Sequence, residues 1–261
     1  MILNTALKAA LSAGEILTEI RSSGFETNKK GARDLVTSGD LAAERCIIDT
    51  IRAAFPNHAI LSEEASPETT LSILNQEAVW IIDPIDGTTN FAHGHFMVAV
   101  SIAFASRGKI QAGVVHAPFL NETFAAERGK GATLNGVTIH CGDKSSLTDA
   151  LVATGFPYDR SDISQIVSRI ERTLKHCRDV RRAGSAALDT CWVACGRVDA
   201  YYETCMVWDI AAAALIAREA GATTGHLHEV PEMWQSVIEL YPEQFLVARP
   251  GVFKALQELL W

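Results

Sequence analysis

The chain has 261 residues, 48% of them hydrophobic and 21% charged, a composition typical of a globular protein and unlike that of a disordered one. Its formal net charge of -8 at pH 7 disfavours binding to nucleic acid and to anionic membranes, because both carry negative charge. The N-terminal segment lacks the pattern of a signal peptide, and no apolar run is long enough to cross a bilayer. We therefore expect a cytoplasmic protein whose partners are neither nucleic acid nor membranes.

The first half of the chain is predicted to begin with two helices and to continue as a sheet. Apolar residues recur at spacings of three and four over residues 2–20 and 38–54, which is the pattern of amphipathic helices, and Ser38 is the expected N-cap of the second helix. Short apolar runs then predict buried strands and antiparallel hairpins at residues 58–62, 79–82, 96–104, 110–116, 122–126 and 137–140.

Helices return in the second half of the chain. They are predicted at residues 163–174, 185–195, 209–220 and 252–260, and strands at 198–202 and 245–247. Helices and antiparallel strands thus come in blocks, which indicates an α+β layered fold and not a doubly wound parallel sheet.

Residues 80–91 carry the strongest chemical signal. An apolar strand ends in two carboxylates, Asp83 and Asp86, with a proline between them and the sequence Gly87-Thr88-Thr89 after them. Carboxylate oxygens suit Mg²⁺, and the N–H groups of a short helix that begins after Gly87 would suit a phosphate group. The alternative is an ordinary acidic turn, because Asp-Pro and Asp-Gly are common turn dipeptides.

Two further acidic residues stand at comparable positions. Glu63 follows the apolar run 59–61 and so lies at a strand end, and Asp209 opens an alanine-rich helix whose small residues would allow close packing. As ligands, they would join Asp83 and Asp86 around divalent cations. Alternatively, Glu63 belongs to a solvated loop and Asp209 is a helix N-cap, a role that still allows it to reach a metal.

These segments resemble the signature blocks of the inositol monophosphatase family. The main matching blocks are Glu63-Glu64, Asp83-Pro-Ile-Asp86-Gly-Thr-Thr-Asn-Phe91, and Trp208-Asp209 with Glu219-Ala-Gly221. Further matches are 34–37 with Asp40, 129–132 with 135–136, 184–187 and 199–203. The resemblance covers roughly residues 1 to 221 and weakens after Gly221, which leaves the C-terminal edge of the sheet uncertain in sequence.

The resemblance implies a layered αβαβα sandwich. It implies a single domain over residues 1–261, with a metal- and phosphate-binding half at about 1–145 and a substrate-side half at about 146–261. The implied reaction is Mg²⁺-dependent hydrolysis of a phosphomonoester with two to three ions, for which Mn²⁺ is a possible substitute. Members of the family are commonly homodimers inhibited by lithium, and Lys29 and Lys30 stand where the family has a mobile flap over the metals.

The resemblance also implies a role for each site residue. Glu63, Asp83 and the carbonyl group of Ile85 would hold a first ion. Asp83, Asp86 and Asp209 would hold a second, and Glu63 would reach a third through water. Thr88, paired with Asp40, would orient the attacking water, so the expected catalytic residues are Glu63, Thr88 and Asp40. The expected substrate contacts are Asp86, Gly87, Thr88, Ala186, Glu203 and Asp209.

The expected substrate is inositol monophosphate or a similar polyol phosphate. Histidinol phosphate, fructose bisphosphate and a 3′-phosphonucleotide remain alternatives on the same fold, and a non-catalytic phosphate-binding regulatory protein is the alternative from another class. The interval from Glu203 to Asp209 is one residue shorter than the inositol-specific pattern, which bears on the substrate more than on the reaction. The presence of all four acidic ligands favours catalysis.

The cysteines and histidines are expected to be structural. Cys191 and Cys195 are four residues apart on a predicted helix and are interpreted as buried small side chains. The sequence has two His-x-His pairs, His93 with His95 and His226 with His228. They are interpreted as exposed loop residues and not as zinc ligands, because the carboxylates already account for the chemistry.

Overall fold

The computed structural model describes residues 1–29, 35–64, 71–143, 146–157 and 163–261. The helices are α1 (Ile2–Ser23), α2 (Ser38–Ala54), α3 (Leu71–Leu74), α4 (Thr88–Ala92), α5 (Ile163–His176), α6 (Ala186–Ala194), α7 (Val207–Glu219) and α8 (Pro250–Leu260). Three 3₁₀ helices are η1 (Pro118–Leu120), η2 (Leu147–Asp149) and η3 (Glu232–Leu240). The strands are β1 (Thr27–Lys29), β2 (Leu35–Thr37), β3 (Ala59–Ser62), β4 (Val79–Asp86), β5 (Ala99–Ser106), β6 (Lys109–Ala117), β7 (Glu122–Glu127), β8 (Ala132–Leu134), β9 (Val137–Ile139), β10 (Leu151–Thr154), β11 (Asp179–Arg181), β12 (Ala200–Glu203), β13 (Thr223–His226) and β14 (Phe245–Ala248).

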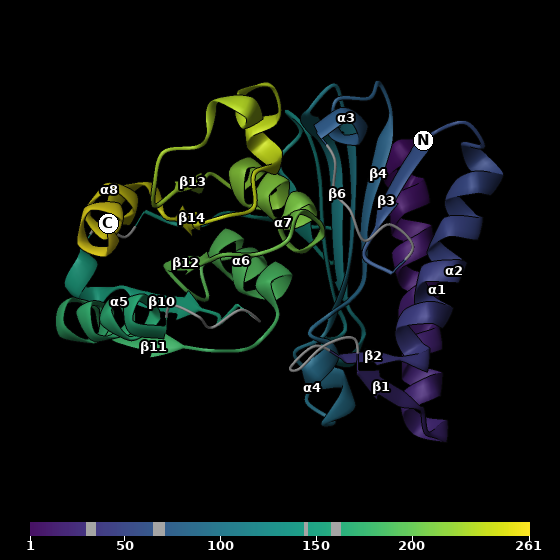
Figure 1. Cartoon of the computed structure of the whole chain (residues 1–261), viewed down its shortest axis with the longest axis horizontal. Coiled ribbons are helices and arrows are strands. Elements are labelled where there is room, and N and C mark those ends of the chain that lie inside the picture. Colours follow the sequence, from purple (N-terminus) through teal and green to yellow (C-terminus); the bar gives the residue numbers. More distant parts are fainter. Residues whose placement is uncertain (30–34, 65–70, 144–145, 158–162) are drawn as a thin grey trace.

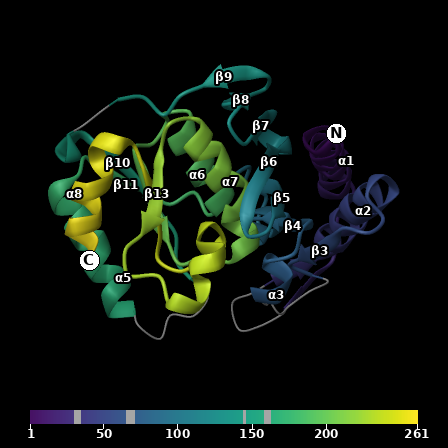
Figure 2. The same ribbon diagram turned by 90° about the horizontal axis from the view of Figure 1, so that it is seen from above.

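These elements form five layers (Figure 1). Helices α1 and α2 cover the outer face of a seven-stranded sheet, and α6 and α7 lie between that sheet and a five-stranded sheet. Helices α5 and α8 cover the far face of the five-stranded sheet, as the view from above also shows (Figure 2). The predicted αβαβα sandwich is confirmed.

The seven-stranded sheet confirms the hairpins predicted for the middle of the chain. Its order is β3-β4-β5-β6-β7-β8-β9, and every neighbouring pair is antiparallel except β3 with β4, which is parallel. The register of β4 against β5 shifts between Asp83 and Asp86. The irregularity turns the end of β4 away from regular pairing, as bulges next to functional sites commonly do.

The five-stranded sheet was only partly predicted from sequence. Its order is β11-β10-β12-β14-β13, and β10 pairs in parallel with both β11 and β12. The divergent segment after Gly221 forms β13, which pairs with β14 at the edge of the sheet. Several strands of three or four residues carry too little periodicity to be recognised in sequence: β1, β2, β8, β10, β11 and β13.

Helix α7 is buried on nearly all sides because it lies between two sheets. Its alanines allow the close approach that the sequence predicts, and Gly113 of β6 allows it from the other side. A Cβ atom at Gly113 would lie 2.7 Å from the carbonyl oxygen of Ala212, well inside normal contact distance. This packing fixes the first turn of α7 relative to the seven-stranded sheet.

Helix α2 has the predicted range, but its N-cap lies one residue before the predicted one. Thr37, and not Ser38, is the N-cap, and its hydroxyl oxygen accepts a hydrogen bond from the N–H group of Gly39. Asp40 completes a capping box by accepting from the N–H group of Thr37 at 2.6 Å. None of the helices in the described ranges combines the length and apolar character that a bilayer span requires.

Candidate metal centre

Three of the four predicted acidic ligands lie at the carboxyl ends of two neighbouring strands. Asp83 and Asp86 end β4 and are both buried. Glu63 directly follows β3, and its N–H group donates to the carbonyl oxygen of Ile82 at 3.2 Å. Because β3 and β4 are parallel, both strand ends reach the same edge of the sheet. The prediction that Glu63 stands at a strand end is confirmed, and the pairing of β3 with β4 places that end beside the Asp83–Asp86 loop.

Asp209 comes from the middle layer of the sandwich. It is the third residue of α7, and its Oδ2 atom accepts from the N–H group of Met206 at 2.8 Å. The alternative in which Asp209 is the N-cap itself does not hold, because Met206 occupies that position. The hydroxyl group of Ser101 donates to the carbonyl oxygen of Trp208 at 3.0 Å, which ties the first turn of α7 to β5.

The pKa shifts show that these carboxylates lie within electrostatic range of one another. Burial, followed by repulsion from Glu63, Asp86 and Asp209, raises the pKa of Asp83 well above its usual range. Burial, followed by repulsion from Asp86, also raises the pKa of Asp209 well above its usual range. Buried like charges destabilise one another unless a cation or a proton neutralises them. The cluster therefore favours a bound cation.

The donor set fits Mg²⁺, although the side chains also make hydrogen bonds of their own. In the described part of the chain, no three His, Cys, Asp or Glu side chains are already arranged around a common point for a metal. One oxygen of Asp83 accepts from the N–H group of Ile85 at 2.9 Å, and one of Asp209 from Met206. Carboxylate and carbonyl oxygens are the ligands that Mg²⁺ prefers. Binding would require the acidic side chains to turn toward the ion.

Asp86 is held by the start of α6. Its carboxylate accepts from the Ser185 hydroxyl at 2.6 Å, from the N–H group of Ala187 at 2.6 Å and from that of Ala186 at 3.3 Å. Burial raises the pKa of Asp86 and these hydrogen bonds lower it. Burial has the larger effect, and the resulting pKa is about 6. The N–H group of Ala186, predicted to contact substrate, thus faces Asp86. Sequence analysis assigned no role to Ser185, although a serine before a helix is a recognisable N-cap.

The predicted short helix follows the two aspartates. Gly87 has a φ of 99°, which only glycine adopts readily, and a Cβ atom there would lie 2.8 Å from the carbonyl oxygen of Met97. Helix α4 begins at Thr88, as predicted. The Thr88 hydroxyl lies 3.3 Å from Asp40 Oδ1 and 3.0 Å from the carbonyl oxygen of Ile85, so the predicted pairing of Thr88 with Asp40 is confirmed.

Two residues that hold α4 in place were not assigned a role from sequence. The Asn90 amide nitrogen donates to the carbonyl oxygens of Met97 at 2.7 Å and Ala183 at 2.9 Å. The Arg21 guanidinium group donates to the carbonyl oxygen of His95 at 2.6 Å and also bonds carbonyl groups of α4. Arg21 stands in the last turn of α1, but nothing in the sequence identifies its partners, about 70 residues away.

Glu203 ends β12 on the side of the site that belongs to the five-stranded sheet. It accepts a hydrogen bond from the Tyr201 hydroxyl at 2.5 Å, and burial raises its pKa to about 7. A side chain at Gly155 would overlap with the Glu203 carboxylate, so that glycine makes room for it. Repulsion from Asp86 adds to the raised pKa of Glu203, and Glu203 in turn adds to that of Asp209.

Asp189 of α6 is a further buried acidic residue near Glu203 that sequence analysis did not single out. Burial raises its pKa well above the usual range, and repulsion from Glu203 and Asp86 adds to the shift. Within the described residues, its Oδ1 atom has no hydrogen-bond partner. Asp189 stands within a predicted helix, and the sequence alone does not show whether an aspartate there faces solvent or the interior.

The cysteines and histidines agree in part with their interpretation. All six cysteines are free, Cys191 is buried and Cys195 is half-buried. His93 and His95 are exposed, as expected. His226 and His228 were wrongly interpreted as exposed loop residues: both are half-buried, and His226 lies in β13. Lys30 of the expected flap lies outside the described residues.

The match to a family model agrees with this geometry. The model of the inositol monophosphatase family matches residues 1–256. The chain belongs to the inositol monophosphatase family. Its similarity to solved structures extends over almost the whole chain. The extragenic suppressor protein suhB from Bartonella henselae has a TM-score of 0.89 and 31% identity, covering 99% of this chain and 98% of that one. Inositol monophosphatase from Anabaena (Nostoc) sp. has a TM-score of 0.85 and 33% identity, covering 99% and 94%.

A curated relative carries a different kind of name. Nus factor SuhB from Escherichia coli (strain K12) is 41% identical over 234 residues, which is 86% of each chain. Relatives in this family therefore include proteins named for phosphatase activity and proteins named as Nus factors.

Proposed function

We propose that this chain is a Mg²⁺-dependent phosphomonoester hydrolase that acts on inositol monophosphate or a similar small polyol phosphate. The observation that carries the proposal is the acidic cluster of Glu63, Asp83, Asp86 and Asp209, in which burial and the neighbouring carboxylates raise the pKa values of Asp83 and Asp209. Membership of the inositol monophosphatase family supports the same reaction.

The proposed ion ligands come from three elements. Glu63, Asp83 and the carbonyl group of Ile85 would hold one ion, Asp83, Asp86 and Asp209 a second, and Glu63 would reach a third through water. Bound Mg²⁺, or Mn²⁺ in its place, would neutralise the phosphate dianion and lower the pKa of a bound water. Lithium inhibition and a homodimeric assembly belong to this proposal, because they are common in the family.

Thr88 and Asp40 would handle the proton of the attacking water. The Thr88 hydroxyl carries one hydrogen, and two acceptors lie within reach of it, Asp40 Oδ1 and the carbonyl oxygen of Ile85. When the Ile85 carbonyl group is used as a ligand, the hydroxyl hydrogen turns to Asp40, and the Thr88 oxygen is then oriented to accept from water. Glu63, across the cluster, would share this task.

The remaining groups would bind the substrate. The N–H groups of Gly87 and Thr88 at the start of α4 would bind phosphate oxygens. Asp86, Asp209, Glu203 and the backbone at Ala186 would contact the alcohol hydroxyl groups. Use of the Ala186 N–H group by substrate would require Asp86 to release it on turning toward an ion.

Phosphate release from a substrate panel tests the proposal. The panel would contain inositol 1-phosphate, histidinol phosphate, fructose 1,6-bisphosphate and a 3′-phosphonucleotide, each with and without Mg²⁺. We expect Mg²⁺-dependent release that is highest with inositol 1-phosphate. Preference for any other member would change the substrate, and no release from any member would contradict the reaction.

A second candidate function is a Nus-factor role, which the name of the curated relatives favours. The net charge of -8 disfavours direct binding to nucleic acid, so the partner in such a role would be a protein. Binding of the purified chain to transcription-complex proteins, with an acidic-cluster variant as control, tests it. Binding that survives loss of the cluster would separate this role from catalysis.

A further inference from the structure

The start of α6 holds one oxygen of Asp86 more closely than the other. Asp86 Oδ2 accepts from the Ser185 hydroxyl at 2.6 Å and from the N–H group of Ala187 at 2.6 Å. Within the described residues, Asp86 Oδ1 accepts only from the N–H group of Ala186, at 3.3 Å. That contact is weak, because N–H···O bonds are usually about 2.9–3.0 Å long. The two oxygens of this carboxylate therefore differ in how firmly they are bound.

The hydroxyl group of Ser185 has a fixed direction. Ser185 is 1% exposed and is the N-cap of α6, where its oxygen accepts from the N–H group of Leu188 at 3.2 Å. An N–H group can only donate, and an ionised carboxylate can only accept. The single hydrogen of the hydroxyl group therefore points to Asp86. One serine both begins the helix and directs a donor at the acidic cluster.

The start of α6 is itself held in place. The Asn90 amide nitrogen donates to the carbonyl oxygen of Ala183 at 2.9 Å, in the loop that leads into the helix. A Cβ atom at Gly184 would lie 3.0 Å from the same amide nitrogen, so this loop packs closely against α4. Helix α6 then continues between the two sheets, with nearly all of its residues buried. The donors of Ser185 and Ala187 are therefore preorganised around Asp86.

An ion at the cluster would bind the oxygen that is less engaged. Two hydrogen bonds already occupy Oδ2 of Asp86, and turning this atom to an ion would leave the buried hydroxyl group of Ser185 and an N–H group without an acceptor, which is unfavourable. Turning Oδ1 to an ion would break only the weak contact with Ala186. The N–H group of Ala186 would then be free to bind another ligand.

We propose that Ser185 is a positioning residue, which retains Oδ2 of Asp86 and thereby presents Oδ1 to the ion. The inference rests on the proposed Mg²⁺-dependent function and adds to it a side chain that binds the ion only through Asp86. It also limits the movement that ion binding requires of Asp86, because the carboxylate keeps its two short bonds to α6.

Mn²⁺ binding by the ion-free protein tests the proposal. Removal of a group that orients a metal ligand typically lowers metal affinity about 10- to 100-fold. We expect a loss of this size in Ser185→Ala and Ser185→Gly, confined to the binding event that is lost in Asp86→Asn. A binding event that is lost in Glu63→Gln and kept in Asp86→Asn should not change. Calorimetric titration and the EPR signal of free Mn²⁺ measure both events.

The two variants separate the donor from the helix cap. Glycine is tolerated as an N-cap much better than alanine, but neither residue donates to Asp86. Ser185→Ala should therefore unfold at a lower temperature than Ser185→Gly in the presence of a chelator, while both lose the same Mn²⁺ affinity. Ser185→Thr keeps the hydroxyl group and should retain wild-type affinity. Thr190→Val is the matched control, because Thr190 is a fully buried residue of α6 whose hydroxyl group has no partner within the described residues.

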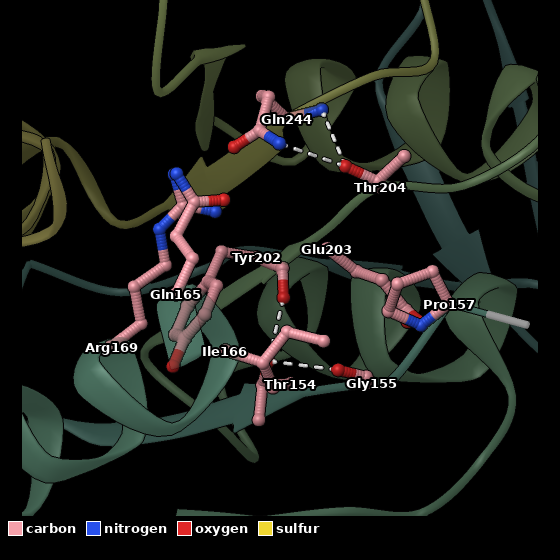
Figure 3. Close-up of a pocket in the computed structure, with 10 residues that line it drawn as sticks. All are labelled: Thr154, Gly155, Pro157, Gln165, Ile166, Arg169, Tyr202, Glu203, Thr204 and Gln244. Carbon is pink, nitrogen blue, oxygen red and sulfur yellow. Dashed lines mark hydrogen bonds between the residues drawn. The ribbon is translucent and has the colours of Figure 1, made fainter. Parts of the chain in front are cut away.

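The location of Ser185 keeps the test specific to the ion. A pocket with a volume of about 130 Å³ lies beside Glu203, and Figure 3 shows the residues that line it. Ser185 is not one of them, so its substitution leaves the lining of this pocket unchanged. A crystal structure of the Mn²⁺-loaded protein adds a direct readout. We expect Oδ1 of Asp86 as the ligand, with Oδ2 still within hydrogen-bond distance of the Ser185 hydroxyl.

Unchanged Mn²⁺ affinity in both Ser185→Ala and Ser185→Gly would overturn the role of Ser185, and so would Mn²⁺ bound to Oδ2. Weakening in the alanine variant alone would assign the effect to the helix cap, and equal weakening in Thr190→Val would assign it to α6 as a whole. Either result would also overturn the proposal, while Mn²⁺ binding and phosphate release by the wild-type protein would stand. Absence of Mn²⁺ binding by the wild-type protein would instead remove the ion site and the phosphatase function together.

Discussion

The hydroxyl oxygen of Thr88 lies 3.3 Å from Asp40 Oδ1, and this contact joins the first turn of α4 to the first turn of α2 across 48 residues of sequence. Asp40 is fully buried and is itself oriented by the N–H and hydroxyl groups of Thr37. Thr88 therefore has a fixed partner on the side away from solvent, as a residue that orients a reacting water requires.

We expect Thr88→Val to lower kcat by about 100-fold or more, the usual size of a lost acid–base contribution, with a small effect on KM. The change keeps the shape of the side chain and removes its hydroxyl group. Steady-state kinetics with inositol 1-phosphate measures the loss. Thr89→Val is the matched control, because Thr89 is the exposed next residue of α4. Equal activity of the two variants would remove Thr88 from the catalytic group.

We expect Asp86→Asn to abolish turnover while the protein remains folded. The substitution removes one ligand charge, but an amide oxygen can still accept from Ser185 and the start of α6. In the ion-free protein above pH 6 the free energy of unfolding should rise, because burial raises the pKa of Asp86 from 3.8 to about 6 and the amide carries no charge. Activity, Mn²⁺ binding and urea unfolding would be compared with Asp49→Asn, which changes an exposed aspartate on α2. Undiminished turnover would contradict the metal assignment.

The ion-free protein should become less stable as pH rises, because of Glu203. Burial raises the pKa of Glu203 from 4.5 to about 7, so between these pH values the folded protein binds more protons than the unfolded chain. The free energy of unfolding therefore falls as pH rises through this window. Glu203→Gln should remove that loss, because glutamine is neutral and can still accept from Tyr201.

The free energy of unfolding of Glu203→Gln should exceed that of the wild-type protein by roughly 3 kcal/mol at pH 8, and this difference should vanish near pH 4.5. Urea unfolding of both proteins at several pH values, in the presence of a chelator, measures it. Parallel stability curves for wild type and variant would show that Glu203 titrates near its ordinary pKa.

Arg21→Gln should destabilise the protein and weaken phosphate binding through α4. The Arg21 guanidinium group bonds carbonyl groups at the end of α4 and lies 3.8 Å from the centre of the Phe119 ring. Hydrogen bonds from a charged donor contribute about 1.5–3 kcal/mol, so we expect a loss of that size, together with a higher KM. Arg52→Gln, at an exposed position in the last turn of α2, is the control. An unchanged KM would limit Arg21 to a structural role.

Addition of Mg²⁺ should raise the melting temperature of the wild-type protein, because a ligand that binds only the folded state stabilises it. The gain is about 2.7 kcal/mol at a concentration 100 times the Kd. Thermal unfolding with a chelator and with increasing Mg²⁺ measures the shift, and Asp83→Asn should abolish it. A shift that persists in Asp83→Asn would place the ion elsewhere.

The local part of the site could be predicted from sequence, and the long-range part could not. Asp83, Asp86 and Gly87 lie in one strand–turn–helix unit, so their spacing alone indicates that they act together. Ser185 bonds to Asp86 across 99 residues, and no periodicity or propensity encodes that contact. The same holds for Arg21.

The α+β layering followed from the pattern of elements and the five-layer sandwich from the family resemblance, whereas exact ends and edges followed from neither. Thr37 and Ser38 are both good N-caps, and only the backbone geometry decides between them. Strand β13 reads Thr-Thr-Gly-His, with no apolar alternation, and exists because β14 offers it an edge. Tertiary pairing overrides weak local preference at such an edge.

Asn90 links two segments that are far apart in the chain, since one amide nitrogen donates to Met97 beside its own helix and to Ala183 in the loop that leads to α6. The loop is thereby joined twice to the turn after β4, through Asn90 and through Asp86. Exchange of either segment alone with that of a homologue would leave unmatched donors and acceptors at the junction. Chimeras in this family should therefore keep residues 83–97 and 183–187 from the same parent.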